Sequence, residues 1–174
     1  MSSIWDTIAE EAAAESQLWA NALLPRLERQ LEPVFSPLGA ERWALGVETI
    51  YEGYLLHYGE PRLFAADDRD AALLLGDYLY AHGLVRIAGF RSVPAVADLA
   101  ELISLCAELR AEGREGDGAA WAATAALLGE GALDGARDAL RLHGDPGRLL
   151  ETAGSAAGFE AVERALATHR ARVG

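Results

Sequence analysis

Residues 72–89 read ALLLGDYLYAHGLVRIAG and form the most apolar stretch of the 174-residue chain. Apolar side chains fall on nearly every side of a helix drawn through this stretch, which predicts a central helix buried in a bundle. One carboxylate, Asp77, lies inside the run. Because an isolated buried charge is costly, we expect Asp77 to be buried and to meet a specific partner: His57, a tyrosine hydroxyl, an arginine, a metal ion or water.

The rest of the chain carries the same helical period. Alanine, leucine, glutamate and arginine abound and β-branched residues are few, which favours helix throughout. Glycine and proline divide the chain into separate segments. We expect helices at about 3–24, with a continuation to 34, and at 41–58, 67–89, 92–112, 118–129, 133–143, 146–153 and 155–172. The sequence therefore predicts an all-α fold, a helical bundle of about seven to eight helices.

Several of these helices begin at residues that are favoured as N-caps. Ser3 with Asp6 resembles a capping box, in which each residue bonds to the backbone of the other. Asp67 or Asp68, in an acidic DDRD run, suits both a cap and the positive end of a helix dipole. Ser92 precedes a helix with proline in its first turn. The acids of the DDRD run are therefore interpreted as capping residues rather than as metal ligands.

A glycine-rich polar segment, GREGDGAA at 113–120, is the clearest candidate for a boundary. We expect a main helical bundle at 1–112, a connection at 113–118 and a C-terminal helical subdomain at 119–174 packed on that bundle. The last part has few large apolar residues, so we expect it to be the less stable of the two.

The composition excludes several functions. The formal net charge is −12 and the pI is about 4.7, which disfavours binding to nucleic acid. All 15 basic residues are arginine, a bias typical of a GC-rich bacterial genome. Without lysine the chain can form no Schiff base and no P-loop.

The single cysteine, Cys106, lies on a helical pattern like a small buried hydrophobe, and it excludes an internal disulfide. The first residues are acidic rather than a basic segment followed by an apolar one, so no signal peptide is expected. No stretch reaches 18 uncharged apolar residues, so no membrane span is expected either. The predicted location is cytoplasmic.

Tyrosines gather on one helical face. Tyr51, Tyr54 and Tyr58 follow at i, i+3 and i+7, and Tyr78 and Tyr80 lie on the next helix. Phenol rings are apolar with a polar tip, so they suit a pocket for an elongated apolar small molecule. Ordinary amphipathic packing explains the same pattern, and the sequence leaves both readings open.

Carboxylates offer a second candidate site. Glu48 and Glu52 are spaced i, i+4, and together with Asp77 they form a group of the kind that holds Mg²⁺ through waters. His57 lies five residues beyond Glu52, on a different side of that helix. No acid stands three residues before any of the four histidines, so the Glu-x-x-His pairs of a di-iron bundle are absent. No metal site is assigned, and Mg²⁺ is the cofactor that the carboxylates would suit.

The same central stretch, with Gly76-Asp77-Tyr78-Leu79 at its middle, resembles a segment of polyprenyl (trans-isoprenyl) diphosphate synthases. The helix ending in YLLHYGEPR, at 54–62, corresponds to the helix that carries their first aspartate-rich motif. The resemblance covers residues 43–112 and implies part of an isoprenoid-synthase-type helical bundle.

The chain departs from the catalytic members of that family. Tyr58 and Gly59 stand where the family has two aspartates, no second aspartate-rich motif follows residue 112, and the lysine-containing diphosphate motif is absent. Transfer of a prenyl group needs metal and cations that converge on the diphosphate. The resemblance therefore implies a non-catalytic relative, like the small subunits of heteromeric prenyl synthases that shape a partner's product cavity.

Three functions stay open. A non-catalytic subunit or interaction protein, acting as a homo-oligomer or beside a partner protein, predicts a large apolar surface on the helices at 41–58 and 67–89. An apolar-ligand-binding bundle predicts an internal pocket near the tyrosines, and a small metal-dependent enzyme predicts that the carboxylates converge with His57. The candidate pocket residues are Glu48, Tyr51, Glu52, Tyr54, His57, Asp77 and Tyr78.

Overall fold

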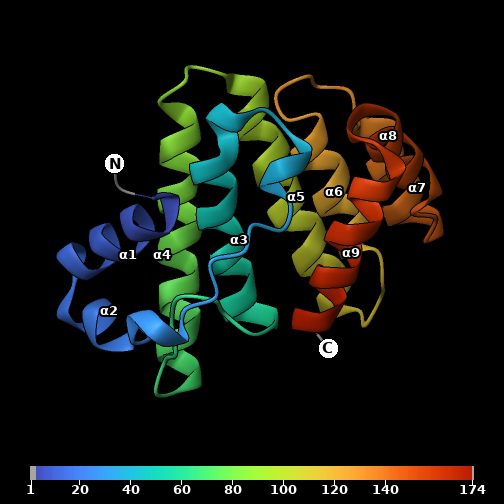
Figure 1. Cartoon of the computed structure of the whole chain (residues 1–174). Coiled ribbons are helices and arrows are strands. Elements are labelled where there is room, and N and C mark those ends of the chain that lie inside the picture. The colour runs from blue at the N-terminus through green and yellow to red at the C-terminus, as the bar shows by residue number, and fades with distance from the viewer. Residues whose placement is uncertain (1–2, 174) are drawn as a thin grey trace.

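The computed structural model describes residues 3–173, and within this range it confirms the predicted all-α helical bundle. Its helices are α1 (Ile4–Glu15), α2 (Gln17–Ala22), α3 (Ala44–Tyr58), α4 (Arg69–Ala88), α5 (Val93–Ala111), α6 (Asp117–Ala126), α7 (Asp134–His143), α8 (Gly147–Ala157) and α9 (Phe159–Val173). Three short 3₁₀ turns join them at Arg26–Glu28, Ser36–Leu38 and Glu41–Trp43. Figure 1 shows α3, α4, α5, α6 and α9 side by side, with α1 and α2 crossing at one edge and α7 and α8 at the other. None of the described helices is both long enough and apolar enough to span a bilayer.

The predicted helix starts are confirmed by their caps. Ser3 and Asp6 form the expected capping box, each accepting from the backbone of the other. The Asp68 carboxylate accepts from the backbone N–H of Ala71 at 2.8 Å, so Asp68 rather than Asp67 is the N-cap of α4. Ser92 caps α5 in the same manner. Local side-chain chemistry thus sets where these helices begin.

The predicted continuation of the first helix to residue 34 is wrong. The helix breaks at Ser16, which caps α2, and this break raises the count of described α-helices to nine. Beyond Pro25 the chain forms one 3₁₀ turn, and Leu27 is fully exposed rather than packed on the core. The chain bonds here to the loop before α4 instead, since Leu24 N–H donates to the Leu63 carbonyl at 2.9 Å.

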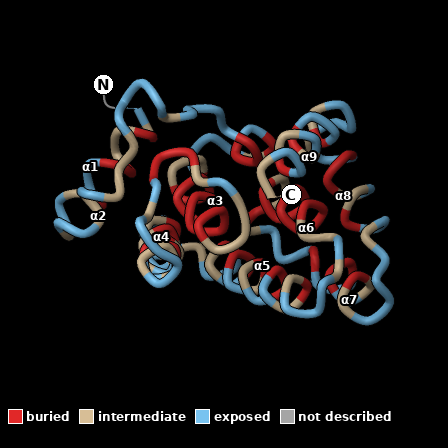
Figure 2. The backbone as a smooth tube through the Cα atoms, turned by 90° about the horizontal axis from the view of Figure 1, so that it is seen from below, coloured by how far each residue is buried: buried red, intermediate tan, exposed pale blue. Residues whose placement is uncertain are grey.

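The prediction that residues 72–89 form the central buried helix is also wrong: that position belongs to α3. Eleven of the fifteen α3 residues are buried, whereas α4 exposes Leu74 and Val85 at 58% and 68%. The burial of each helix is visible along the bundle in Figure 2, where α4 lies at the rim with one side toward solvent. Helix α4 therefore has one side exposed to solvent, although its sequence is apolar on nearly every side of the helix.

Two glycine pairs bring α3 and α4 together. A Cβ on Gly53 would lie 2.8 Å from the Gly76 carbonyl oxygen, and a Cβ on Gly83 would lie 3.1 Å from the Gly46 carbonyl oxygen. On each helix the two glycines are seven residues apart and so share one face. The backbones of α3 and α4 approach more closely at Gly53 than any side chain there would allow, and at Gly83 a side chain would fit only tightly.

The core continues across the glycine-rich segment at 113–118. The main hydrophobic cluster runs from Val34 to Ala165 and includes most of α6, with Trp121 at its centre. A second, smaller cluster joins α1 to α3, α4 and the loop between them, and it contains Trp5, Ile8, Ala12, Leu56, Leu63, Phe64, Leu75 and Leu79. The helices after 113–118 therefore share the main core with α3 and α5.

Gly53→Ala tests the close approach of α3 and α4. Alanine normally stabilises a helix interior over glycine by about 0.5–1 kcal/mol. At position 53 the new Cβ meets a backbone carbonyl, so we expect a net loss of about 1–3 kcal/mol in the free energy of unfolding, measured by urea denaturation. Gly135→Ala on α7 is the control, because its nearest neighbour is a flexible Arg148 nitrogen at 3.6 Å. Equal stabilisation by both substitutions would contradict the close contact.

Candidate functional site

The predicted carboxylate pair on α3 lies around a buried arginine. Glu48, Glu52 and Arg62 have no exposed surface at all. Arg62 Nη1 donates to Glu48 Oε2 at 2.6 Å, and Arg62 Nε donates to Glu52 Oε2 at 3.0 Å. The two remaining carboxylate oxygens accept hydrogen bonds from backbone N–H groups. Glu48 Oε1 accepts from the N–H groups of Val34 and Ser36. Glu52 Oε1 accepts from the N–H groups of Arg62 and Leu63. We call these three side chains the Arg62 centre.

Two aromatic rings enclose the Arg62 guanidinium. Its Cζ lies 4.6 Å from the centroid of the Trp5 ring and 5.0 Å from that of Tyr51. Such contacts favour a cation and exclude water from it. The carboxylates raise the pKa of Arg62 although its burial acts the other way. The Arg62 centre is thus a permanently charged, water-free unit that holds α1, α3 and the loop before α4.

The predicted burial of Asp77 is wrong, because its side chain is 69% exposed. Position 77 faces outward on α4, whereas the adjacent Gly76 faces α3. Asp77 Oδ1 lies 3.0 Å from His57 Nε2, so its neighbour is one of the several partners that the sequence left open. Burial lowers the pKa of His57, although the carboxylate of Asp77 opposes that shift. The Glu48–Glu52 pair, bound to Arg62, and the solvent-facing Asp77 therefore do not form one metal-binding group, and no other such group occurs within residues 3–173.

Tyr51 and Tyr54 lie in the main core. Their rings pack on Trp121 with centroids 5.0 and 5.6 Å away, and Tyr51 also meets Phe35 edge to face. Tyr58 continues the row, 5.0 Å from Tyr54. The rings of Tyr51 and Tyr54 thus fill the interior themselves, as ordinary amphipathic packing predicts, rather than lining an empty pocket.

The two hydroxyls reach a charged network at the start of α6. Tyr54 donates to Asp117 Oδ2, which also accepts from Arg110 Nη2 at 2.6 Å. His169 Nε2 lies 3.1 Å from the same oxygen, and its Nδ1 lies 2.9 Å from the Tyr51 hydroxyl. We call these five side chains the Asp117 network. It joins α3, α5, α6 and α9, and both ring nitrogens of His169 lie within hydrogen-bond distance of other members of the network.

Burial and hydrogen bonding act against each other at Asp117. Desolvation alone raises the pKa of this carboxyl, but hydrogen bonds from His169 and Tyr54 and the neighbouring cations outweigh it, so the pKa of Asp117 lies below its ordinary value. The same environment, burial above all, raises the pKa of Tyr54 well above its usual range. At neutral pH the network therefore contains an aspartate anion and a neutral tyrosine.

The remaining predicted pocket residue, Tyr78, is remote from this network. Its hydroxyl lies 2.8 Å from His82 Nδ1 on the same helix, and its ring lies 6.0 Å from that of Trp19. Tyr80 instead stacks on His57 with centroids 5.0 Å apart. The seven predicted site residues are thus divided among four places: the Arg62 centre, the Asp117 network, the His57–Asp77 pair, and Tyr78 beside Trp19 of α2.

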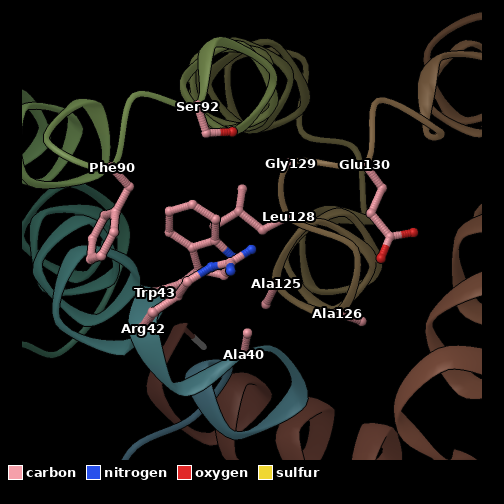
Figure 3. A pocket seen from close by; sticks show the side chains of 10 residues that line it. All are labelled: Ala40, Arg42, Trp43, Phe90, Ser92, Ala125, Ala126, Leu128, Gly129 and Glu130. Atoms are coloured by element: carbon pink, nitrogen blue, oxygen red, sulfur yellow. The ribbon is translucent and has the colours of Figure 1, made fainter.

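Clefts open at two ends of the molecule. One, of about 320 Å³, lies between the turn before α3, the α4–α5 junction and the end of α6. Figure 3 shows the Trp43 indole beside Leu128 in this cleft, with the Arg42 guanidinium over the indole. The Cζ atom of Arg42 lies 4.5 Å from the centroid of the indole ring. A second cleft, of about 530 Å³, borders the Asp117 network and is enclosed by the α5–α6 connection, α8 and α9. Only the second cleft has buried polar groups at one end and apolar walls at the other.

Sequence reasoning missed Arg62, Arg110, Asp117 and His169. A signal existed for Arg62: two glutamates one turn apart on an otherwise apolar helix need a cation if that face is buried. For the others no local signal existed, because 52 residues separate Asp117 from His169 and 63 separate it from Tyr54. Such pairs are set by the tertiary fold alone.

No protein-family model matches this sequence, and neither a curated protein nor a solved structure matches it.

Arg62→Met tests the Arg62 centre. The substitution leaves two buried carboxylates without their cation, so we expect a loss of about 3–5 kcal/mol in the free energy of unfolding. Adding Glu52→Gln should then recover part of this loss, since glutamine keeps an oxygen for the backbone donors but carries no charge. Glu52→Gln alone should destabilise. If the losses in unfolding free energy of the two single variants simply added up in the double variant, charge pairing would not be what stabilises the Arg62 centre.

Asp117→Asn tests the Asp117 network through pH. Unfolded aspartate titrates at roughly pH 3.9, and the folded pKa is lower. The stabilisation by the carboxylate is therefore complete above about pH 5 and is lost as the pH falls through the interval between these two values. We expect the substitution to cost about 1–3 kcal/mol at pH 7 and the difference in Tm to shrink below about pH 4. A difference that stays constant down to acid pH would contradict the assignment.

Proposed function

We propose that the chain is a non-catalytic helical subunit that acts by pairing with another helical chain, in the first place a second copy of itself. The proposal follows the resemblance to polyprenyl diphosphate synthases, whose non-catalytic small subunits act beside a partner. The observation that carries it is the chemistry of the outer surface of α4 and α5.

The fully exposed positions of α4 and α5 carry little charge, while the partly exposed Glu101 and Glu108 of α5 are paired with Arg141 of α7. After the first turn of α4, the exposed positions on the two helices are Leu74, Asp77, Ala81, Val85, Ala88, Val93, Pro94, Ala97, Ala100, Ser104, Ala107 and Ala111. Only Asp77 is charged among them, and it is paired with His57, although charged residues make up 24% of the whole chain. We call these twelve positions the α4–α5 face. Figure 2 shows the two helices next to each other at the rim of the bundle, each with an exposed side.

The composition of the α4–α5 face suits helix packing. Its spacing on α5, with alanines or serine at steps of three and four residues, gives a smooth surface that a second helix can approach closely. Leu74 and Val85 on α4 supply larger apolar groups that water would otherwise cover. We therefore take the pairing surface to be on α4 and α5; the helix at 41–58, on which the sequence also predicted it, is buried as α3.

The state of the carboxylates also favours a non-catalytic role. Chemistry on a diphosphate needs free acidic groups to hold metal ions and cations to meet the phosphates. Glu48 and Glu52 are instead saturated by Arg62 and by backbone donors. His57 and Asp77 pair with each other on the outside of the bundle. The candidate residues are therefore engaged in holding the fold.

Val85→Arg tests the proposal. Light scattering coupled to gel filtration, with the wild-type chain at about 100 μM, should show a dimer. At this concentration a dimer with a micromolar dissociation constant is the main species. The arginine should convert it to a monomer that keeps the helical content of the wild-type chain by circular dichroism, because position 85 is 68% exposed. Leu142→Arg on α7, at 69% exposure, is the matched control and should remain a dimer. A monomeric wild-type chain at this concentration would refute self-pairing.

A further inference from the structure

The one charged residue of the α4–α5 face is in contact with a histidine. Asp77 lies between Leu74 and Ala81 on the exposed side of α4, and its side chain is 69% exposed. Its Oδ1 atom lies 3.0 Å from Nε2 of His57, whose side chain is only 13% exposed. A second copy seated on this face would cover the Asp77 carboxylate, whereas His57 is already largely covered in the free chain.

The fold holds the His57 ring in a fixed position beside this carboxylate. The ring lies flat against that of Tyr80, with centroids 5.0 Å apart and an angle of 5° between the planes. It also fills the space left by Gly76, where a Cβ would lie 2.7 Å from Nε2. The Nε2 atom is shielded from water. Because the ring is packed by two residues of α4, Nε2 stays beside Asp77.

Three further charged groups surround His57. Arg69, at the start of α4, donates from Nη1 to the backbone carbonyl of His57 at 3.1 Å. Glu60, just after α3, and Arg172 of α9 line a shallow cleft together with His57. The two arginines oppose a proton on the imidazole and Glu60 favours it. Asp77 is the group whose charged atoms lie at hydrogen-bond distance from the ring, so its carboxylate is the charge that such a proton would meet first.

Burial keeps His57 neutral in the free chain at neutral pH. Desolvation of the ring lowers the pKa of His57, the Asp77 carboxylate opposes this shift, and the Arg69 cation adds to it. The adjacent phenols of Tyr58 and Tyr80 stay protonated, because burial raises the pKa of both. At neutral pH the face therefore presents an aspartate charge that its neighbouring ring does not compensate.

Pairing changes this balance. Water solvates the Asp77 carboxylate in the free chain, and a charge that loses its water is costly unless it is paired. A proton on Nε2 of His57 turns the contact into an ion pair, and the attraction between the two charges grows as water leaves the interface. The paired chains therefore bind a proton at His57 more tightly than the free chains do.

We propose that pairing of two copies through the α4–α5 face takes up a proton from solvent at His57 of each copy, so that the dimer tightens as the pH falls from about 8 to about 6. This proposal rests on the proposed pairing through that face. Carboxylates ordinarily titrate near pH 4, so histidine is the side chain that changes charge in this interval. The free chain folds with a neutral ring, so the pH acts on association.

Sedimentation equilibrium of the intact chain at about pH 6, 7 and 8, at constant ionic strength, tests the proposal. Each proton taken up per dimer changes the dissociation constant by up to tenfold per pH unit, so we expect this constant to fall at least about tenfold from pH 8 to pH 6. Asp77→Asn should pair at pH 8 as tightly as the wild type does at pH 6 and should lose the pH dependence.

Two histidine variants complete the test. His57→Gln should lose the pH dependence and pair weakly throughout, with its fold verified by circular dichroism. His143→Gln, at an exposed histidine of α7, is the matched control and should keep the wild-type dependence. If His57→Gln does not fold, Asp77→Asn, at an exposed position, decides the question alone.

The outcomes separate this proposal from the pairing on which it rests. A wild-type dimer with the same dissociation constant at pH 6 and pH 8 would overturn proton uptake and leave the pairing intact. A pH dependence that persists in Asp77→Asn would overturn it as well. A wild-type chain that stays monomeric at all three pH values would refute the pairing, and proton uptake with it.

Discussion

Arg62 is a guanidinium without exposed surface, held between Glu48 and Glu52 under the rings of Trp5 and Tyr51. Removing such ions from water costs several kcal/mol each, and only close pairing with full hydrogen bonding offsets that cost. Every oxygen of both glutamates is occupied here, partly by backbone N–H groups of irregular segments. The Arg62 centre therefore fixes two segments that lie outside the α-helices. These are residues 34–36 and the loop before α4.

Tyr51 connects this centre to the other half of the bundle. Its ring faces the Arg62 guanidinium, and its hydroxyl meets His169 on α9. One turn further along α3, Tyr54 meets Asp117 at the start of α6. Helix α3 thus presents charge to the N-terminal segments and phenols to the C-terminal helices, while Gly46 and Gly53 face α4. Each side of α3 consequently has a specific partner, which explains why α3, rather than α4, lies at the centre.

The sequence predicted what depends on neighbours along the chain and failed where the partner is distant. Caps and breakers such as Ser3, Asp68 and Ser92 placed most helices, because the groups that bond there are three residues apart. An all-round apolar run such as residues 72–89 contains no signal for which face turns outward, so the exposure of Asp77 was predicted wrongly. For Asp77 the sequence indicated His57 only as one of several possible partners. The pairing of Asp117 with His169 was not predictable, because nothing in either segment requires the other.

The distribution of charge bears on the proposed pairing surface. A chain with a net charge of −12 repels a second copy at long range, over roughly a Debye length of 8–10 Å. Pairing of two copies therefore needs a region with few acids. The α4–α5 face meets this condition, because its exposed positions are mostly small and uncharged and its one acid, Asp77, lies beside His57. The acids on the rest of the surface oppose contacts at other sites.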